Sequence, residues 1–327
     1  MTPTGLIWVL LGPHTGDNNQ LLALARALGR PFETMQLHYN LLRKLGPAIL
    51  GTSLVAVSGK SRRQLDPPWP HVVIGIGRRS VPVARWIKQM SGGRTKLVRL
   101  GDPRLDPGLF DLVLTTPQYR IAASQTVVQL PLALSPYQEP VRAEPDEREW
   151  LQACERPHLL LAVGGKTRNW RLSSETLVET AQSLARRAGQ AGGCLTIATS
   201  ARTGAELTEA LRSVTFDRFN CQLVEGSRPR FAVLLADADE CFVTADSVSM
   251  MSEAILAGKP VGLVPVELTA AGRMRLGRRI GGGHRDLRRF WARLEQDGLV
   301  GTVDEPRRGT IKNPMAIAAQ AVNGLLD

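Results

Sequence analysis

Residues 242–258 have the pattern of a short apolar strand, a polar turn and a helix whose first turn is rich in small hydroxyl side chains. The N-terminus of a helix carries a partial positive charge and unpaired backbone N–H groups, so it suits a phosphate. Glu253 falls about two turns into this helix, where a carboxylate can accept both hydroxyls of a ribose. The alternative is that Asp246 or Ser247 only caps an ordinary helix. The nucleoside-diphosphate residues predicted here are Thr244, Asp246, Ser247, Ser249, Met250 and Glu253.

A second strand–turn–helix pattern follows the apolar run Leu159–Val163. Two glycines come directly after the run and allow a ligand to approach the backbone closely, while the next three residues supply charge and donors for phosphate. The glycine spacing fits neither the Walker pattern nor the dinucleotide fingerprint, and a plain turn with solvated basic residues is the alternative. Ligands of open α/β sheets bind at the carboxyl ends of the strands, so two such loops favour a phosphate site. The residues predicted to bind it are Gly164, Gly165, Lys166, Thr167 and Arg168.

The first loop of the chain holds the candidate catalytic residues. Asp17 or His14 could take the proton from an acceptor hydroxyl as that hydroxyl attacks the anomeric carbon of a sugar. The alternatives are that Asp17 caps a helix beginning near Asn18 and that His14 is merely exposed. The substrate-binding residues predicted in this loop are Gly12, Gly16, Asn18 and Gln20.

These motifs resemble those of a known family. The segments Gly164–Thr167 and Thr244–Ala254 are similar to signature segments of the mitochondrial-fission Elm-type family. Gly12–Gln20 resembles the family's first loop and Phe290–Glu295 its late helix, so the resemblance covers almost the whole chain. Bacterial members are regarded as glycosyltransferases of the GT-B class. The resemblance therefore implies a GT-B-like α/β fold of two doubly wound, Rossmann-like domains that face a central cleft.

Strand-like and helical stretches alternate on both sides of an acidic, proline-rich break, which independently favours two doubly wound α/β domains. Residues 1–135 are predicted to form an acceptor-side domain, residues 136–157 a linker with one short helix, and residues 158–305 the nucleotide-sugar domain. Residues 306–327 are predicted to form a C-terminal helix that packs back on the first domain. The strands expected next to the candidate loops are Leu6–Leu11, Val72–Ile76, Leu159–Val163 and Cys241–Thr244.

Basic residues exceed acidic ones, with 41 Lys and Arg against 30 Asp and Glu and a net charge of +11. Eight arginines and one acid lie between Ala271 and Arg293, which fits a phosphorylated ligand, an anionic membrane surface or nucleic acid. No DNA- or RNA-binding motif accompanies them and aromatic residues are few, so no nucleic-acid partner is expected. Arg273–His284 is predicted as a mobile loop that orders on phosphate, and a helix is predicted from Asp286.

Two further patterns have competing interpretations. The apolar run Leu45–Ser58 is flanked by basic residues and is too short to span a bilayer. A core helix or strand is favoured for it over an interfacial membrane contact. Asp237 and Asp239 have the Asp-x-Asp spacing of metal-dependent transferases, but a solvated turn is favoured, and no metal site is predicted.

The four cysteines, which are widely spaced and include no Cys-x-x-Cys pair, are predicted to be separate buried thiols in a reducing compartment. The first residues lack the pattern of a signal peptide. A cytoplasmic protein is therefore expected, with peripheral attachment to the inner face of the cytoplasmic membrane as a further option. The cysteines are Cys154, Cys194, Cys221 and Cys241.

Together these features predict a glycosyltransferase that moves a sugar from a nucleoside-diphosphate sugar to a lipid-linked or cell-envelope acceptor, without a metal or other cofactor. Helix N-termini and basic residues would stabilise the departing diphosphate. Two alternatives remain. One is a non-enzymatic membrane-recruitment or scaffold protein with a nucleotide-binding fold, and the other is a sugar-nucleotide epimerase or hydrolase that uses the same donor pocket.

Overall fold

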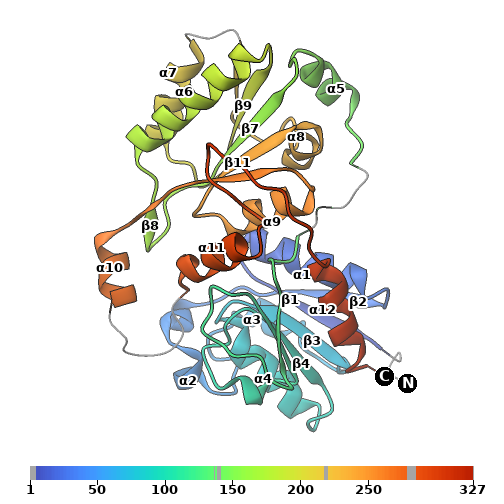
Figure 1. Cartoon of the computed structure of the whole chain (residues 1–327). Helices are drawn as coiled ribbons and strands as arrows, with labels where there is room; N and C mark the ends of the chain where they lie inside the picture. Colours follow the sequence, from blue (N-terminus) through green and yellow to red (C-terminus); the bar gives the residue numbers. More distant parts are fainter. Residues whose placement is uncertain (1–4, 136, 138–140, 217–219, 278–284, 327) are drawn as a thin grey trace. The chain divides into compact units, whose positions relative to one another are not determined.

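The chain divides into two compact units, which are described separately. The computed structural model describes residues 5–135, 137, 141–216, 220–277 and 285–326 (Figure 1). Unit 1 comprises residues 1–136 and 312–327, and unit 2 comprises residues 137–311. Each unit is built around one parallel sheet with helices on both faces.

The sheet of unit 1 has six strands in the order β2-β1-β3-β4-β5-β6, all of them parallel. The central strands consist of nearly continuous apolar residues, as expected when both faces of a parallel sheet are covered. The chain changes direction across the sheet between the adjacent strands β1 and β3. From β1 it continues to β2 on one side, and from β3 it continues to β4 on the other. The strands are β1 Ile7–Leu11, β2 Phe32–Gln36, β3 Val72–Ile76, β4 Lys96–Leu100, β5 Leu112–Thr115 and β6 Val127–Gln129.

Helices α1 and α12 cover one face of this sheet and α4 covers the other. Buried residues of α1 and α12 share a core with Ile7, Val9 and Ile74, whereas those of α4 share one with Trp8, Leu10 and other residues of the opposite face. Alternate residues of one strand therefore supply two separate cores, which follows from the two-residue repeat of a β-strand. The helices of unit 1 are α1 Thr15–Ala27, η1 Leu41–Lys44, α2 Pro47–Leu50, α3 Gly59–Arg62, α4 Ser80–Met90, η2 Pro107–Leu109 and α12 Pro314–Asn323.

The sheet of unit 2 has five parallel strands in the order β10-β9-β7-β11-β12. A short antiparallel pair, β8 with β13, lies outside it. The strands are β7 His158–Val163, β8 Trp170–Arg171, β9 Cys194–Thr199, β10 Cys221–Val224, β11 Glu240–Thr244, β12 Val261–Val264 and β13 Glu267–Leu268. The helices are α5 Pro145–Gln152, α6 Ser174–Gln190, α7 Ala205–Phe216, α8 Phe231–Asp237, α9 Val248–Leu256, α10 Ala270–Gly277 and α11 Leu287–Gln296.

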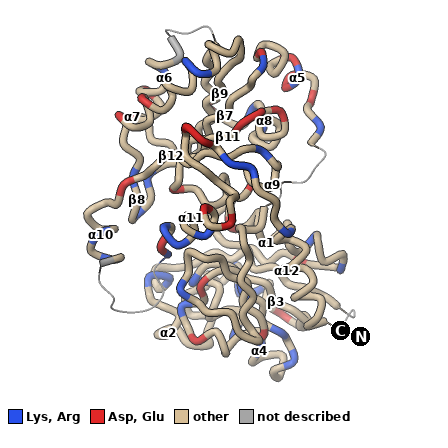
Figure 2. The backbone as a smooth tube through the Cα atoms, viewed as in Figure 1, with Lys and Arg blue, Asp and Glu red and all other residues tan. Residues whose placement is uncertain are grey.

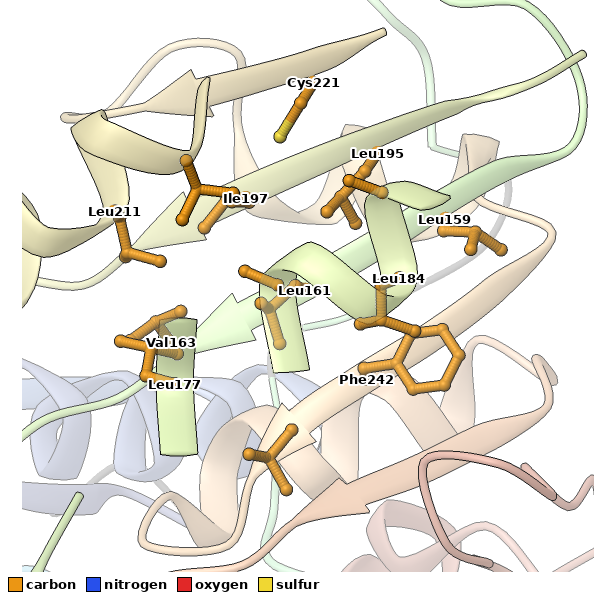
Figure 3. Packing of buried hydrophobic residues seen from close by; sticks show 14 of the residues in the cluster. Leu159, Leu161, Val163, Leu177, Leu184, Leu195, Ile197, Leu211, Cys221 and Phe242 are labelled. Carbon is orange, nitrogen blue, oxygen red and sulfur yellow. The ribbon is translucent and has the colours of Figure 1, made fainter. Parts of the chain in front are cut away.

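Helices α6 and α7 lie against one face of the second sheet, where the packing is dense (Figure 3). Leu159, Leu161 and Val163 are alternate residues of β7 and point towards the helices, where they join Leu177 and Leu184 of α6. Each is at most 1% exposed. Complete burial of a leucine side chain contributes roughly 1.5–3 kcal/mol, so this core holds the carboxyl end of β7 firmly.

The segment predicted as a linker contains α5, and side chains tie this helix to unit 2. Glu147 is buried and accepts hydrogen bonds from the guanidinium of Arg230, the closest at 2.6 Å from Nη2 to Oε2. After α5, Cys154 is joined by a disulfide to Cys194 of β9, with a Cα–Cα distance of 5.5 Å. The prediction of four separate thiols is therefore wrong for this pair, because folding brings together two cysteines that lie 40 residues apart.

Replacing Glu147 with glutamine should lower the free energy of unfolding at pH 7 by about 1–2 kcal/mol, since a charged hydrogen bond is lost and Arg230, 42% exposed, is partly screened by water. Hydrogen bonds from Arg230 lower the pKa of Glu147 from 4.5 to about 2 against the opposing effect of burial. The carboxylate therefore stabilises the fold above pH 4.5 and stops doing so as pH falls through about 2. Denaturation curves should show the mutant and the wild type converging over this range.

Glu149→Gln, on the exposed side of the same helix, is the matched control and should change stability by less than about 0.5 kcal/mol. A Glu147→Gln protein as stable as the Glu149→Gln protein at pH 7 would contradict the role given to the buried carboxylate.

The apolar run Leu45–Ser58 forms neither the core helix nor the strand that its composition favours. Only Pro47–Leu50 is helical, and Ile49 and Val55 are 74% and 47% exposed. Leu50 and Val57 are buried, so the core interpretation holds for part of the run only. Glycine and proline interrupt the run and prevent regular periodicity. None of the described helices is both long enough and apolar enough to cross a bilayer.

The arginine-rich stretch is more ordered than predicted where the structure describes it. Arg273 to Gly277 belong to α10, so the predicted loop is wrong there, and residues 278–284 lie outside the described part of the chain. The helix predicted from Asp286 is confirmed as α11, whose first turn Asp286 caps. Figure 2 shows basic and acidic residues interspersed over the described parts of both units.

Candidate functional site

In unit 2 the two predicted loops meet at the carboxyl ends of β7 and β11. These strands are neighbours, and the chain leaves them in opposite directions across the sheet. The N–H group of Gly164 donates to Thr244 Oγ1 at 2.8 Å, and that of Gly165 donates to Asp246 Oδ2 at 3.0 Å. Thr244 Oγ1 in turn donates to Asp246 Oδ1 at 2.8 Å. The loops that the sequence singled out separately are one hydrogen-bonded unit.

Asp246 is the centre of this network. Its carboxylate is 2% exposed and lies 3.1 Å from the guanidinium of Arg202, in the loop between β9 and α7. Both glycines are required by space: a Cβ on Gly164 would overlap this carboxylate, and one on Gly165 would overlap the carbonyl of Arg202. Asp246 therefore organises the loops from within. The glycine amides bind within this network, whereas the side chains of Lys166 and Arg168 are exposed.

Lys166 lines a pocket of about 600 Å³. The N-termini of α6 and α7 also reach this pocket, through Ser173 and Gly204. Arg171 is paired with Glu267 at 2.8 Å and Arg202 with Asp246, whereas Lys166 makes no ion pair with any described residue. Two helix N-termini and one unpaired ammonium group favour an anion in this pocket, against the opposing effect of Glu175 and Glu206, which lie in the first turns of the same helices and also line it.

Thr167 and Arg168 follow Lys166 and connect the glycine turn to β8. Thr167 closes a short turn with Trp170. Its backbone N–H donates to the carbonyl oxygen of Trp170 at 2.9 Å, and its hydroxyl bonds to the same carbonyl oxygen and to the N–H of Trp170. Arg168 is exposed, and its carbonyl oxygen accepts from Thr269 Oγ1. Thr167 is therefore a structural residue here, while the guanidinium of Arg168 remains the predicted contact for a ligand.

Helix α9 begins where β11 ends. Ser247 occupies the N-cap position, but its side chain makes no capping hydrogen bond, so capping does not account for this serine. Ser249 and Met250, in the first turn, are half-buried, as is Glu253. The indole of Trp291, from α11, donates to the carbonyl oxygen of Ala245 at 2.9 Å and fixes the turn before the helix. The N-terminus of α9 is therefore held in place from both sides.

In unit 1 the first loop lies between β1 and α1. Asn18 makes a reciprocal pair of hydrogen bonds with the backbone of Gly12, each 2.9 Å long. Helix α1 begins at Thr15 with His14 as its N-cap residue, so the alternative in which Asp17 caps a helix near Asn18 is wrong. Asp17 lies inside the first turn instead, where a carboxylate interacts favourably with the helix dipole.

A pocket of about 270 Å³ opens beside this loop, near the neighbouring strands β1 and β3, between which the strand order of unit 1 changes direction. Gly12, His14, Asp17 and Asn18 line one side. Residues 76–80, between β3 and α4, line the other. Gly16 and Gln20 are not among its lining residues; Gly16 is exposed and Gln20 half-buried on α1. The structure thus brings together four of the six residues predicted from this loop.

Several basic residues near the two pockets were not predicted as site residues from the sequence. Arg78 and Arg79 follow β3 and precede the first turn of α4, and Arg202 follows β9 before α7. Each belongs to a strand–turn–helix with glycine and hydroxyl residues, the same signal that Gly164–Arg168 gives. Arg99, inside β4, gives no such signal, because a charged residue in an apolar strand is equally compatible with an exposed edge.

The carboxylates of Asp237 and Asp239, 24% and 39% exposed, are bound by protein donors instead of standing in a freely solvated turn. The backbone N–H of His158 donates to Asp239, and His158 Nδ1 lies 2.6 Å from Asp237 Oδ2. Both carboxylates also accept from Arg156. His158 Nε2 is within 2.8 Å of Thr196 Oγ1, so both ring nitrogens of this buried histidine are engaged beside the disulfide. These residues anchor the start of β7, at the opposite end of the strand from the candidate site.

The two parallel sheets, each with helices on both faces, define a GT-B-like fold of two Rossmann-like domains. A UDP-GlcNAc 2-epimerase from Neisseria meningitidis bound to UDP-GlcNAc is similar to this chain, with a TM-score of 0.56 and 12% identity, over 98% of this chain and 99% of the other. MurG from Acinetobacter baumannii has a TM-score of 0.50 and 16% identity, over 99% and 91% of the two chains. UGT89C1 from Arabidopsis thaliana has a TM-score of 0.54 and 11% identity, over 98% and 100%.

The chain belongs to the mitochondrial fission ELM1 family, whose model matches residues 15–322. The mitochondrial fission protein ELM1 of Arabidopsis thaliana is 23% identical over 242 residues, which are 66% of this chain and 56% of that protein. An uncharacterized protein of Rickettsia prowazekii, RP120, is 30% identical over 109 residues, 33% of this chain and 30% of that protein. The chain thus matches about half of one curated relative and less than a third of the other.

Proposed function

We propose that the protein is a GT-B-type glycosyltransferase whose unit 2 binds a nucleoside-diphosphate sugar. The observation that carries the proposal is the joined pair of loops after β7 and β11, with α9 beginning directly behind them. Solved structures of this fold that contain UDP-GlcNAc or UDP support a nucleotide-sugar ligand. In the proposal Lys166 and the first turn of α9 hold the diphosphate, and Glu253 accepts the ribose hydroxyls. The residues of α9 are not among those that line the pocket of Lys166, so the diphosphate would extend from that pocket towards α9.

The chemistry assigned to the chain's residues is electrostatic. As the bond between the sugar and the diphosphate breaks, negative charge grows on the leaving group. Donors already oriented at a helix N-terminus, together with Lys166 and Arg168, would stabilise this charge without reorganising. Asp17 or His14 of unit 1 is proposed as the base that takes the proton of the acceptor hydroxyl. Turnover is expected to persist in the presence of a metal chelator, and strict dependence on a divalent cation would contradict this mechanism.

Glu253→Ala should weaken UDP binding by about 1–3 kcal/mol, because hydrogen bonds from the ribose to a carboxylate are lost. This corresponds to an increase in Kd of about 5- to 150-fold. Calorimetry with UDP measures it directly, and Glu179→Ala, on the exposed side of α6, is the matched control. Equal UDP affinity in wild type and Glu253→Ala would remove the assignment of Glu253 to the ribose.

A sugar-nucleotide epimerase or hydrolase is the second candidate, because solved structures of 2-epimerases are among those most similar in fold. Incubation with a panel of radiolabelled nucleotide sugars, with and without a membrane lipid extract, separates the candidates. Label in the lipid fraction supports a transferase, free sugar supports a hydrolase, and an altered sugar on the nucleotide supports an epimerase. UDP binding without turnover of any donor would favour the scaffold interpretation.

A further inference from the structure

Arg99, on β4, is a buried charge that the proposed reaction does not use. Its side chain is 2% exposed and lies beside Gly75 of the neighbouring strand. Gly75 provides the room, because a Cβ there would lie 3.0 Å from Ser80 Oγ and 3.7 Å from Arg99 Nη1. Nη1 donates to Ser80 Oγ at 2.9 Å, but Nε and Nη2 find no acceptor among the described residues. Buried donors of a charged group are costly when unpaired, so a negative charge close to this guanidinium would stabilise it.

The guanidinium lies directly behind the wall of the 270 Å³ pocket. Its partner Ser80 lines that pocket, as do Tyr39 and Asp17, which both interact electrostatically with Arg99. Burial lowers the pKa of Arg99 to about 10, and the opposing effects of Tyr119, Asp102, Tyr39 and Asp17 do not cancel this decrease. Asp102 is itself paired with Arg104 at 3.2 Å. The positive charge behind the pocket is therefore incompletely compensated.

Other groups around the pocket also favour an anion. Helix α1 and helix α4 both begin at its edge, so the positive ends of two helix dipoles lie beside it. Gly77 turns the chain before α4 with a φ of +70°, which places exposed Arg78 and half-buried Arg79 on the pocket wall. Burial raises the pKa of Tyr39 well above its usual range, so its hydroxyl remains a neutral donor at physiological pH.

We propose that this pocket binds a phosphate or diphosphate group, and that the acceptor of the reaction is therefore a phosphorylated molecule. The pocket volume is near the lower end of the roughly 300–1,000 Å³ typical of small-molecule sites, which suits one charged group of a larger ligand. The anion site depends only on unit 1. Its assignment to the acceptor rests on the proposed transferase function, with Asp17 beside the bound group as the candidate base.

The test is calorimetry of the full chain with inorganic pyrophosphate, first free and then saturated with UDP to occupy unit 2. Wild type and Arg26→Ser, which removes an exposed arginine at the far end of α1, should bind pyrophosphate equally. Arg99→Met should weaken binding about tenfold or more. The surface variant Arg78→Ser/Arg79→Ser should do the same and leaves the buried core intact, so a folding defect of Arg99→Met would not obscure the result.

Equal pyrophosphate affinity in the wild type and both arginine variants would overturn the proposal, as would binding that is lost only in Lys166→Ala. Failure of UDP to bind, with pyrophosphate binding still sensitive to Arg99, would overturn the proposed function and leave the anion site standing. Sedimentation with phosphatidylcholine vesicles, with and without polyprenyl phosphate, identifies the source of the group. Cosedimentation that requires Arg78 and Arg79 indicates a phosphorylated lipid, and its absence indicates a water-soluble phosphate.

Discussion

Replacing Asp246 with alanine should lower the free energy of unfolding of unit 2 by about 2–4 kcal/mol, because two buried donors lose their acceptor while Arg202, 45% exposed, is partly screened by water. The N–H of Gly165 and the hydroxyl of Thr244 would lose their acceptor, and Arg202 would lose its counter-charge. Since the same carboxylate joins the two loops of the candidate donor site, UDP affinity should fall with stability. Asp246→Asn should cost less, because its amide oxygen can still accept one of these hydrogen bonds.

Thermal unfolding followed by calorimetry measures the first effect, and UDP titration of the folded protein measures the second. Asp304→Ala removes a carboxylate from an exposed turn and should change stability by less than about 0.5 kcal/mol. If Asp246→Ala unfolds at the same temperature as Asp304→Ala, the buried network does not hold the loops together.

Introducing aspartate at Val322 should destabilise unit 1 by several kcal/mol. Val322 and Ala318 of α12 are fully buried and share a core with Leu21 and Leu24 of α1. A carboxylate at Val322 would have to leave water without a partner in this apolar core, which unfolding of α12 from unit 1 would relieve. Because α12 supports α1, and α1 carries the proposed base at its N-terminus, transfer activity should be lost together with the contact.

Ala316→Asp is the matched control for this substitution. Ala316 is exposed in the first turn of the same helix, where a negative charge interacts favourably with the helix dipole. This variant should be as stable as the wild type or slightly more stable. Denaturant unfolding compares the two, and similar midpoints for Val322→Asp and Ala316→Asp would show that α12 contributes little to unit 1.

The sequence predicted the elements of this protein well, because the signals that define them are local. The apolar run Leu159–Val163 predicts a buried strand and the stretch from Asp286 predicts a helix, and both are confirmed. Repeated strand–turn–helix patterns were sufficient to predict the α/β class, and the resemblance carried by Thr244–Ala254 is confirmed by membership of the ELM1 family.

Local sequence patterns gave wrong predictions at positions where the tertiary surroundings decide the burial or the partners of a side chain. Ile49 has the residue type of a core position but is exposed, because the irregular backbone around it presents no continuous apolar face to the sheet. Asp237 and Asp239 had the spacing of a metal motif or an exposed turn, yet they bind His158 and Arg156, which lie about 80 residues earlier in the chain. Nothing within a few residues of either aspartate indicates these partners.

What the sequence by itself determined was the set of strands, helices and loop chemistries. The tertiary structure alone decided which loops meet. Asp246 binds Gly165 and Arg202 because β11, β7 and β9 are consecutive in the sheet. Arg99 contacts Ser80, a lining residue of the pocket beside the first loop, because β4 lies beside β3 and Gly75 leaves room for its guanidinium. Strand order depends on the summed packing of the whole sheet, so the pairing of distant charges appears only when the chain is folded.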